Sequence, residues 1–81
     1  MHAETATQPF AEILSPAELT ALTAAATWYF KSHARIIAEE AADRSALALT
    51  RREDFLGLHS ALWKLGVRLA LPDELQPYRL V

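Results

Sequence analysis

The stretch LSPAEL, residues 14–19, decides the fold because it carries the signals of a helix start. Ser15 is suited to cap a helix, Pro16 fits the first helical position, and Glu18 completes a capping box. Residues 20–44 contain no Gly or Pro and are rich in Ala, the strongest helix former. We therefore expect a first helix over residues 16–44.

A second start signal follows at Thr50-Arg51-Arg52-Glu53, which also has the spacing of a capping box. It predicts a second helix over residues 51–71, ended by Pro72. A short link between two long helices favours an antiparallel helical hairpin. The expected fold is therefore all-α, one domain over residues 1–81, with a disordered lead-in over 1–8 and an apolar tail over 72–81.

The predicted second helix is apolar over a wider arc than one hairpin contact can cover. One seam contains Phe55, Leu58, Leu62, Leu65 and Leu69, and a second stripe beside it contains Leu56, His59, Trp63, Gly66, Val67 and Ala70. One solution is a homodimer in which two hairpins form a four-helix bundle, and a partner protein would serve equally. The alternative is that the tail folds back, with Tyr78 and Leu80 packing near Leu19 and Leu22. A turn near residues 47–48 would place His33 opposite Leu62.

Composition excludes several classes of protein. The chain has 81 residues, a formal net charge of −2, no Cys and two Gly. Thiol chemistry, disulfides and a glycine-rich phosphate loop are thereby ruled out. No apolar run is long enough to span a bilayer, and no signal peptide is recognisable. We expect a cytoplasmic protein that does not insert into membranes.

His33, His59 and Glu40 fall on or near the predicted apolar faces. One interpretation is a metal or ligand site between the helices. The other is that both histidines are half-buried and bond to neighbours such as Tyr29, while Glu40 pairs with Arg44. Metal sites in helical bundles commonly use a Glu-x-x-His spacing, which this chain lacks, so we favour the structural interpretation.

Trp28 lies on the face of the first helix opposite the core, with Lys31 and Arg35 beyond it. It is either an anchor for a protein partner, since Trp and Arg are typical of binding hot spots, or it packs under Phe10 or Ile13. Trp63 is expected in the dimer interface. The partner-binding residues predicted from the sequence are thus Trp28, Lys31, Arg35, Trp63, Tyr78 and Leu80.

Three basic residues, Arg44, Arg51 and Arg52, cluster where the hairpin tip is expected. They allow a contact with nucleic acid, or they are neutralised by nearby acids at a solvated turn. The sequence favours a non-enzymatic interaction module or assembly subunit that acts as a helical homodimer and uses no cofactor. The alternatives are a small regulator that contacts nucleic acid through the basic tips, and a His-lined ligand or metal site.

Overall fold

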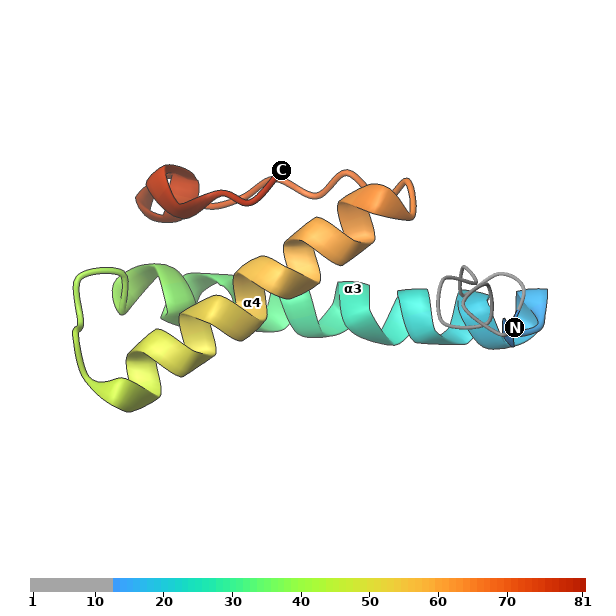
Figure 1. Ribbon diagram of the computed structural model, residues 1–81, viewed down its shortest axis with the longest axis horizontal. Helices are drawn as coiled ribbons and strands as arrows, with labels where there is room; N and C mark the ends of the chain where they lie inside the picture. Colours follow the sequence, from blue (N-terminus) through green and yellow to red (C-terminus); the bar gives the residue numbers. More distant parts are fainter. Residues whose placement is uncertain (1–12) are drawn as a thin grey trace, which may run out of the picture.

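The computed structural model describes residues 13–81, and these form an antiparallel helical hairpin followed by a structured tail (Figure 1). The first long helix, α3, spans Pro16–Glu39, and the second, α4, spans Ala46–Lys64. The tail contains one short 3₁₀ helix, η1, at Asp73–Tyr78. The predicted all-α hairpin is confirmed. The expected lead-in over residues 1–8 lies outside the described residues, as does Phe10.

The start of α3 is the predicted one. The Ser15 hydroxyl accepts a hydrogen bond from the Glu18 backbone N–H at 3.1 Å, and the Glu18 carboxylate accepts one from the Ser15 N–H at 2.8 Å. This is a complete capping box with Pro16 at the first helical position. Such a cap contributes about 1 kcal/mol to helix stability.

The link between the helices lies earlier in the chain than expected. The predicted first helix ran to residue 44, whereas α3 ends at Glu39. The signal that the prediction missed is Asp43 followed by Ser45. The Asp43 carboxylate accepts the Ser45 backbone N–H at 2.8 Å, and the Ser45 hydroxyl caps α4 by accepting the Ala48 N–H at 3.2 Å. These local bonds compete with helical ones and turn the chain.

The predicted capping box at Thr50 is wrong, because Thr50 lies inside α4. Residues 46–49, Ala-Leu-Ala-Leu, are good helix formers and extend the helix back to the Ser45 cap. The helix therefore starts five residues before the predicted position at residue 51.

The end of α4 also differs from the prediction, which placed it at residue 71. Gly66 has a φ of +92°, the left-handed conformation that ends helices. Its N–H bonds to the Trp63 carbonyl, and the Val67 N–H bonds to the Leu62 carbonyl at 2.8 Å. These two bonds form a Schellman motif. Gly66, which the sequence placed inside the second helix, is thus a helix stop.

The earlier link changes which residues face each other across the hairpin. The Phe30 ring stacks on Phe55 with centroids 4.4 Å apart, and on His59 at 5.7 Å. The predicted register, which paired His33 with Leu62, is therefore wrong. The predicted pairs are displaced because the turn lies at residues 40–45 and not at 47–48.

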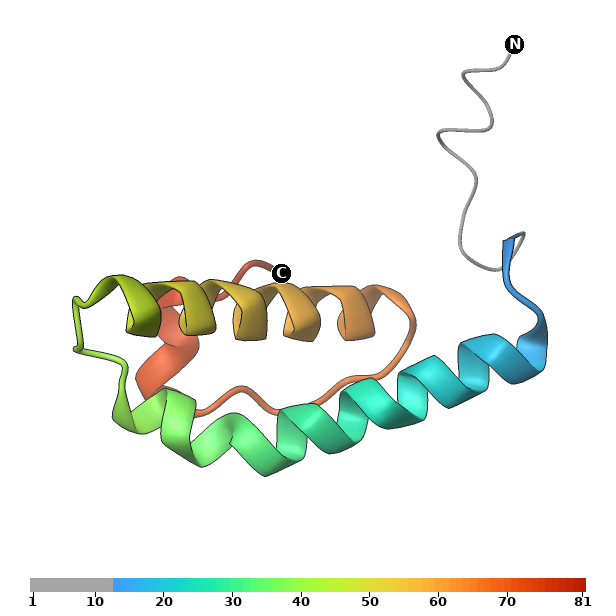
Figure 2. The ribbon, with the colours of Figure 1, turned by 90° about the horizontal axis from the view of Figure 1, so that it is seen from below.

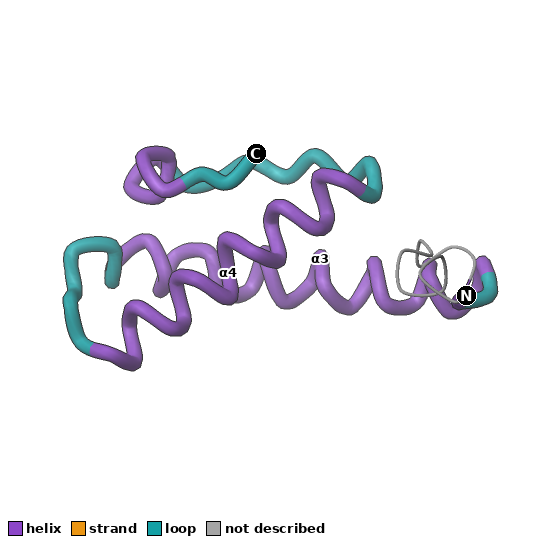
Figure 3. The backbone as a smooth tube through the Cα atoms, viewed as in Figure 1, coloured by secondary structure: helices purple, strands orange, loops and turns teal. Residues whose placement is uncertain are grey.

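After Gly66 the chain reverses and runs back along the hairpin towards its tip (Figures 1 and 3). In Figure 2 the tail passes behind α3 and α4. The tail residues Leu71 and Leu75 are buried in the core, which also contains Phe30, Ile37, Phe55, Leu56 and Leu62. Of the two solutions for the second apolar stripe, covering by the tail is the one seen within a single chain.

The predicted position of the tail's end is wrong. Tyr78 does not reach Leu19 and Leu22 but lies at the tip, where the Arg52 guanidinium sits 4.8 Å from the centre of its ring. Because Gly66 reverses the chain directly after α4, the tail runs along the hairpin rather than beyond it. Leu22, at the end of the hairpin away from the tip, is left exposed.

Candidate interaction surface

Helix α3 carries two apolar lines, and only one of them is buried. Phe30 and Ile37 are buried against α4 and the tail. The second line contains Leu22, Tyr29 and Ile36, whose exposed fractions are 57%, 44% and 53%. These three residues recur at intervals of seven, so they form one straight stripe along the helix.

Helix α4 adds to the same side of the hairpin. Leu47, Leu58 and Leu65 lie on one line because the intervals of 11 and 18 residues are close to whole numbers of turns. Leu47 and Leu65 have exposed fractions of 62% and 45%, and Leu58 is half-buried. We call the two lines together the open face; it consists of Leu22, Tyr29, Ile36, Leu47, Leu58 and Leu65. The tail lies behind this hairpin layer in Figure 2.

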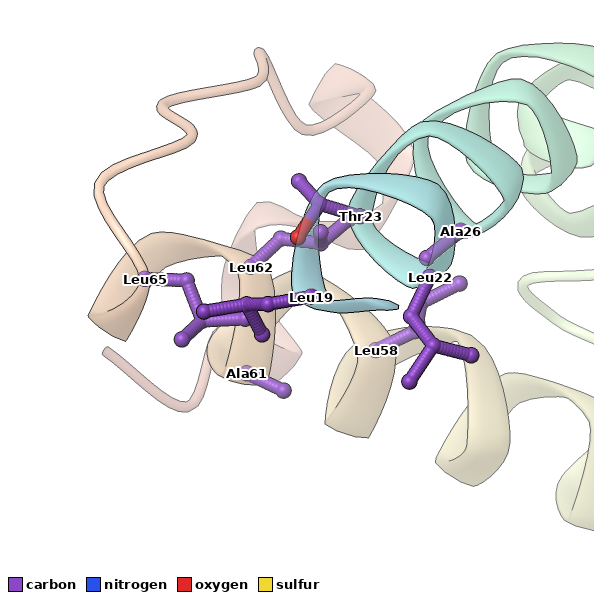
Figure 4. Close-up of a pocket in the computed structure, with 8 residues that line it drawn as sticks. All are labelled: Leu19, Leu22, Thr23, Ala26, Leu58, Ala61, Leu62 and Leu65. Atoms are coloured by element: carbon purple, nitrogen blue, oxygen red, sulfur yellow. The ribbon is translucent and has the colours of Figure 1, made fainter. Parts of the chain in front are cut away.

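A groove interrupts the open face at the end away from the tip. Its walls come from the first turns of α3 and the last turns of α4, and the side chains converge on one hollow of about 110 Å³ (Figure 4). The Thr23 hydroxyl is the one polar side-chain group among the residues that line it. The lining residues are Leu19, Leu22, Thr23, Ala26, Leu58, Ala61, Leu62 and Leu65.

Charged groups stand at the two ends of the α3 stripe. Glu18 is at the groove end, where hydrogen bonds from the Ser15 backbone and hydroxyl lower the pKa of its carboxyl. Glu40 is at the tip end, where its carboxylate accepts a hydrogen bond from Arg51 at 2.6 Å. The predicted pairing of Glu40 with Arg44 is replaced by this longer-range contact. Between Glu18 and Glu40 the stripe itself carries no charged residue.

Trp28 lies about 100° around α3 from the stripe, on the face away from the core, and has an exposed fraction of 68%. Ile13 is also exposed, so it does not shield the indole ring. Beyond it, Lys31 is exposed, and Arg35 bonds to the Glu74 carboxylate of η1 at 2.7 Å. A backbone hydrogen bond and the Arg35 contact lower the pKa of Glu74. Arg35 thus helps to hold the tail, and Trp28 remains a candidate anchor.

Two of the residues predicted to bind a partner, Trp63 and Tyr78, instead contact their own chain. The Trp63 ring lies 4.4 Å from the Arg68 guanidinium and 4.6 Å from that of Arg79, so it is partly covered without a second chain. Tyr78 stacks on Arg52. Leu80 is exposed at the chain end and does not extend the open face.

The three tip arginines are not equivalent. Arg44 is exposed, and Arg51 is paired with Glu40. Arg52 is buried, and its guanidinium donates to the backbone carbonyls of Ala41 at 2.9 Å and Glu40 at 3.4 Å. Arg52 therefore supplies a donor to the Ala41 carbonyl just beyond α3 and a second donor to the Glu40 carbonyl, which also accepts the Asp43 N–H at 3.0 Å. The predicted cluster of three is not a continuous basic surface.

The two histidines each bond to a backbone carbonyl. His33 stacks on Tyr29 and its Nδ1 donates to the Tyr29 carbonyl at 2.9 Å. His59 is buried, and its Nε2 donates to the Leu69 carbonyl at 3.1 Å, which ties α4 to the tail. Across residues 13–81, no group of three His, Asp or Glu side chains is placed to hold a metal ion. Both histidines thus bond to neighbouring groups, as the structural interpretation expects, but His59 is buried rather than half-buried and Glu40 pairs with Arg51 rather than Arg44.

The sequence did not indicate the part that α4 plays in the open face. Leu58 and Leu65 were placed in the buried seam, and Leu47 in the link. The signal that could have found them is Gly66, read as a helix stop. The turn at residues 40–45 sets the hairpin register, and the reversal at Gly66 carries the tail along the other side of α4.

The comparisons with known proteins add no functional assignment. No family model, no curated protein and no solved structure matches the chain. Within residues 13–81, the helices lack the combination of length and apolarity that crossing a bilayer requires. The proposals below rest on the geometry of the chain itself.

Proposed function

We propose that the chain is a non-catalytic interaction module that binds a second copy of itself through the open face and acts as a helical homodimer. The observation that carries this proposal is the α3 stripe of Leu22, Tyr29 and Ile36, about half exposed and uncharged over four turns. Coiled-coil seams have this spacing, and large exposed apolar patches mark interaction sites.

The area of the surface favours a partner with two helices. A stable interface buries about 800 Å² on each partner, which is more than three half-exposed side chains of one helix supply. Leu47, Leu58 and Leu65 on α4 extend the patch to two helices wide. A second hairpin of the same width matches it, and two stacked hairpins make a four-helix bundle.

The polar residues of the chain support a non-catalytic role. His59 and Arg52 bond to backbone carbonyls that need a partner, and Glu40 pairs with Arg51. These contacts hold the fold together. A nucleic-acid contact is less favoured, because only Arg44 of the three tip arginines is exposed and free of these contacts. The cytoplasmic location stays a prediction from the sequence.

The test is a measurement of mass in solution by sedimentation equilibrium over a range of protein concentrations. The unaltered chain is expected to have twice the mass of one chain. Tyr29→Glu places a charge at the centre of the open face and is expected to give monomers, because burying an unpaired carboxylate is costly. Circular dichroism checks that the helices remain.

Trp28→Glu is the matched control. It introduces the same charge one residue away, on the other side of α3, and is expected to leave the dimer intact. If the unaltered chain is a monomer at every concentration, or if Trp28→Glu alone dissociates the dimer, the open face is not the interface.

A further inference from the structure

The open face is hollow at one end and raised at the other. The groove lies at the end where α3 begins and α4 finishes. At the tip, the exposed side chains of Ile36 and Leu47 stand out from the last turns of α3 and the first turn of α4. A surface with a hollow and a matching projection can complement a copy of itself.

The spacing on α3 allows this match about a two-fold axis. Tyr29 lies midway between Leu22 and Ile36, seven residues from each. If two α3 helices cross in opposite directions at Tyr29, Leu22 of one copy lies opposite Ile36 of the other. The groove wall of one copy thereby meets the projection of the second.

The spacing on α4 agrees independently. Leu47 and Leu65 have their midpoint at Leu56. The contact between Phe30 and Phe55 shows that this midpoint lies at the same level of the hairpin as Tyr29. One two-fold axis therefore pairs Leu47 with Leu65 of the other copy as well as Leu22 with Ile36.

The shape of the open face favours the same orientation. When two open faces stack with both tips at one end, α3 of each copy lies over α4 of the other, so each groove faces the other groove and the projecting side chains meet each other. With the tips at opposite ends, each groove instead faces the projecting side chains of the other copy.

We infer that two copies stack open face to open face with their tips at opposite ends, so that Ile36 and Leu47 of each enter the groove of the other. This inference rests on the proposed self-association and adds the orientation of the partner. The groove is then half of a symmetric contact rather than a site for a small molecule.

The chain has no cysteine, so single thiols can report this geometry directly. Leu22→Cys, Tyr29→Cys and Ile36→Cys are each oxidised mildly, alone and in an equal mixture of Leu22→Cys with Ile36→Cys that carry tags of different mass. Tyr29→Cys is expected to cross-link to itself at the axis. The mixture is expected to form a mixed disulfide on the order of 100-fold faster than unassembled chains, because assembled thiols meet at millimolar effective concentration.

Ala24→Cys is the control, because it is exposed on the other side of α3 and is expected to stay reduced. Leu22→Cys and Ile36→Cys, each alone, are also expected to stay largely reduced. If these two cross-link to themselves and the mixture gains nothing, the tips lie at the same end and the inference is overturned while the homodimer stands. A dimeric mass without any of the expected disulfides also overturns the orientation. A monomeric mass overturns both proposals.

Discussion

The two long helices carry similar amounts of apolar sequence, yet the fold covers them very differently. Helix α4 packs against α3 on one side and against the tail on the other, and it buries Phe55, Leu56, His59 and Leu62. Helix α3 is longer and buries only Phe30, Ile37 and Ala38. The difference shows that exposure depends on which face the tail reaches, because a side chain's hydrophobicity alone does not decide it. The α3 stripe is left uncovered in the single chain.

The largest expected effect comes from a substitution in α4, the helix that is covered on both sides. Phe55→Ala removes a ring that is fully buried and stacked on Phe30, and it should lower the free energy of unfolding by about 3–5 kcal/mol. Urea titration measures the loss. Ile36→Ala on the open face should cost far less in dilute protein, and its cost should grow with protein concentration as dimers form. Equal costs at all concentrations would contradict the distinction between the two helices.

The tail is the element that makes α4 different, and Leu75 is its fully buried anchor. Leu75→Ala should destabilise the fold by about 2–5 kcal/mol. Leu80→Ala, the same change at an exposed position five residues later, should cost almost nothing. Thermal melts followed by circular dichroism compare the two. A mild effect of Leu75→Ala would mean that the tail does not cover α4 in solution.

Arg52 is buried and its neighbour Arg51 is exposed, so the two compare a covered and an uncovered charged side chain. Arg52→Leu leaves the Ala41 carbonyl without its donor, removes the weaker of two donors to the Glu40 carbonyl, and should cost about 1–3 kcal/mol. Arg51→Leu breaks an exposed ion pair with Glu40 and should cost no more than about 1 kcal/mol. Urea titration at low protein concentration orders the two. The reverse order would show that burial of Arg52 does not stabilise the tip.

Replacing Gly57, inside α4, and Gly66, just after its end, with Ala should change the stability of the protein with opposite signs. Gly57 is helical and exposed with open space around its Cα, so Gly57→Ala should stabilise the protein by about 0.5–1 kcal/mol. Gly66 has equal space but a φ of +92°, so Gly66→Ala should destabilise it by roughly 1 kcal/mol. The midpoint of thermal unfolding gives the sign for each. A gain from Gly66→Ala would contradict the helix stop on which the tail's reversal depends.

The smallest effect is the response to acid. Hydrogen bonds from Ser45 lower the pKa of Asp43, and hydrogen bonds also lower the pKa values of Glu18 and Glu74. A carboxyl with a lowered pKa in the folded state contributes stability above its unfolded value, near 4, and loses it as the pH falls through the folded value. The unfolding midpoint should therefore fall on acidification below about pH 5. The fall should be shallower in Asp43→Asn, and an unchanged profile would show that the Ser45 contact is not formed.

The sequence allowed prediction of the hairpin because the signals for it are local. The capping box at Ser15 and the long alanine-rich run after it need no tertiary information. The predicted start of the second helix was displaced because Thr50 and Glu53 also have the spacing of a capping box. Ser45 and Asp43 together make the stronger start signal. When two capping patterns lie a few residues apart, the sequence does not show which of them forms its hydrogen bonds.

The surface was less predictable, because it depends on the register and on the path of the tail. The wide apolar arc of α4 indicated correctly that more than one hairpin contact is needed. It did not show that the tail would cover α4 and that the uncovered apolar surface would lie on α3. Trp63 is an example, since Arg68 and Arg79 reach its ring only after Gly66 turns the chain back.

Arg52 has a consequence for how the chain folds. Its guanidinium bonds to the end of α3, its backbone belongs to α4, and its flat side rests on Tyr78 of the tail. No other side chain described here joins all three segments through polar or cation–π contacts. Closing the hairpin therefore places the group on which the tail docks, and docking the tail shields the bonds that close the hairpin. The two steps reinforce each other, and the hairpin and tail should form and open as one cooperative unit.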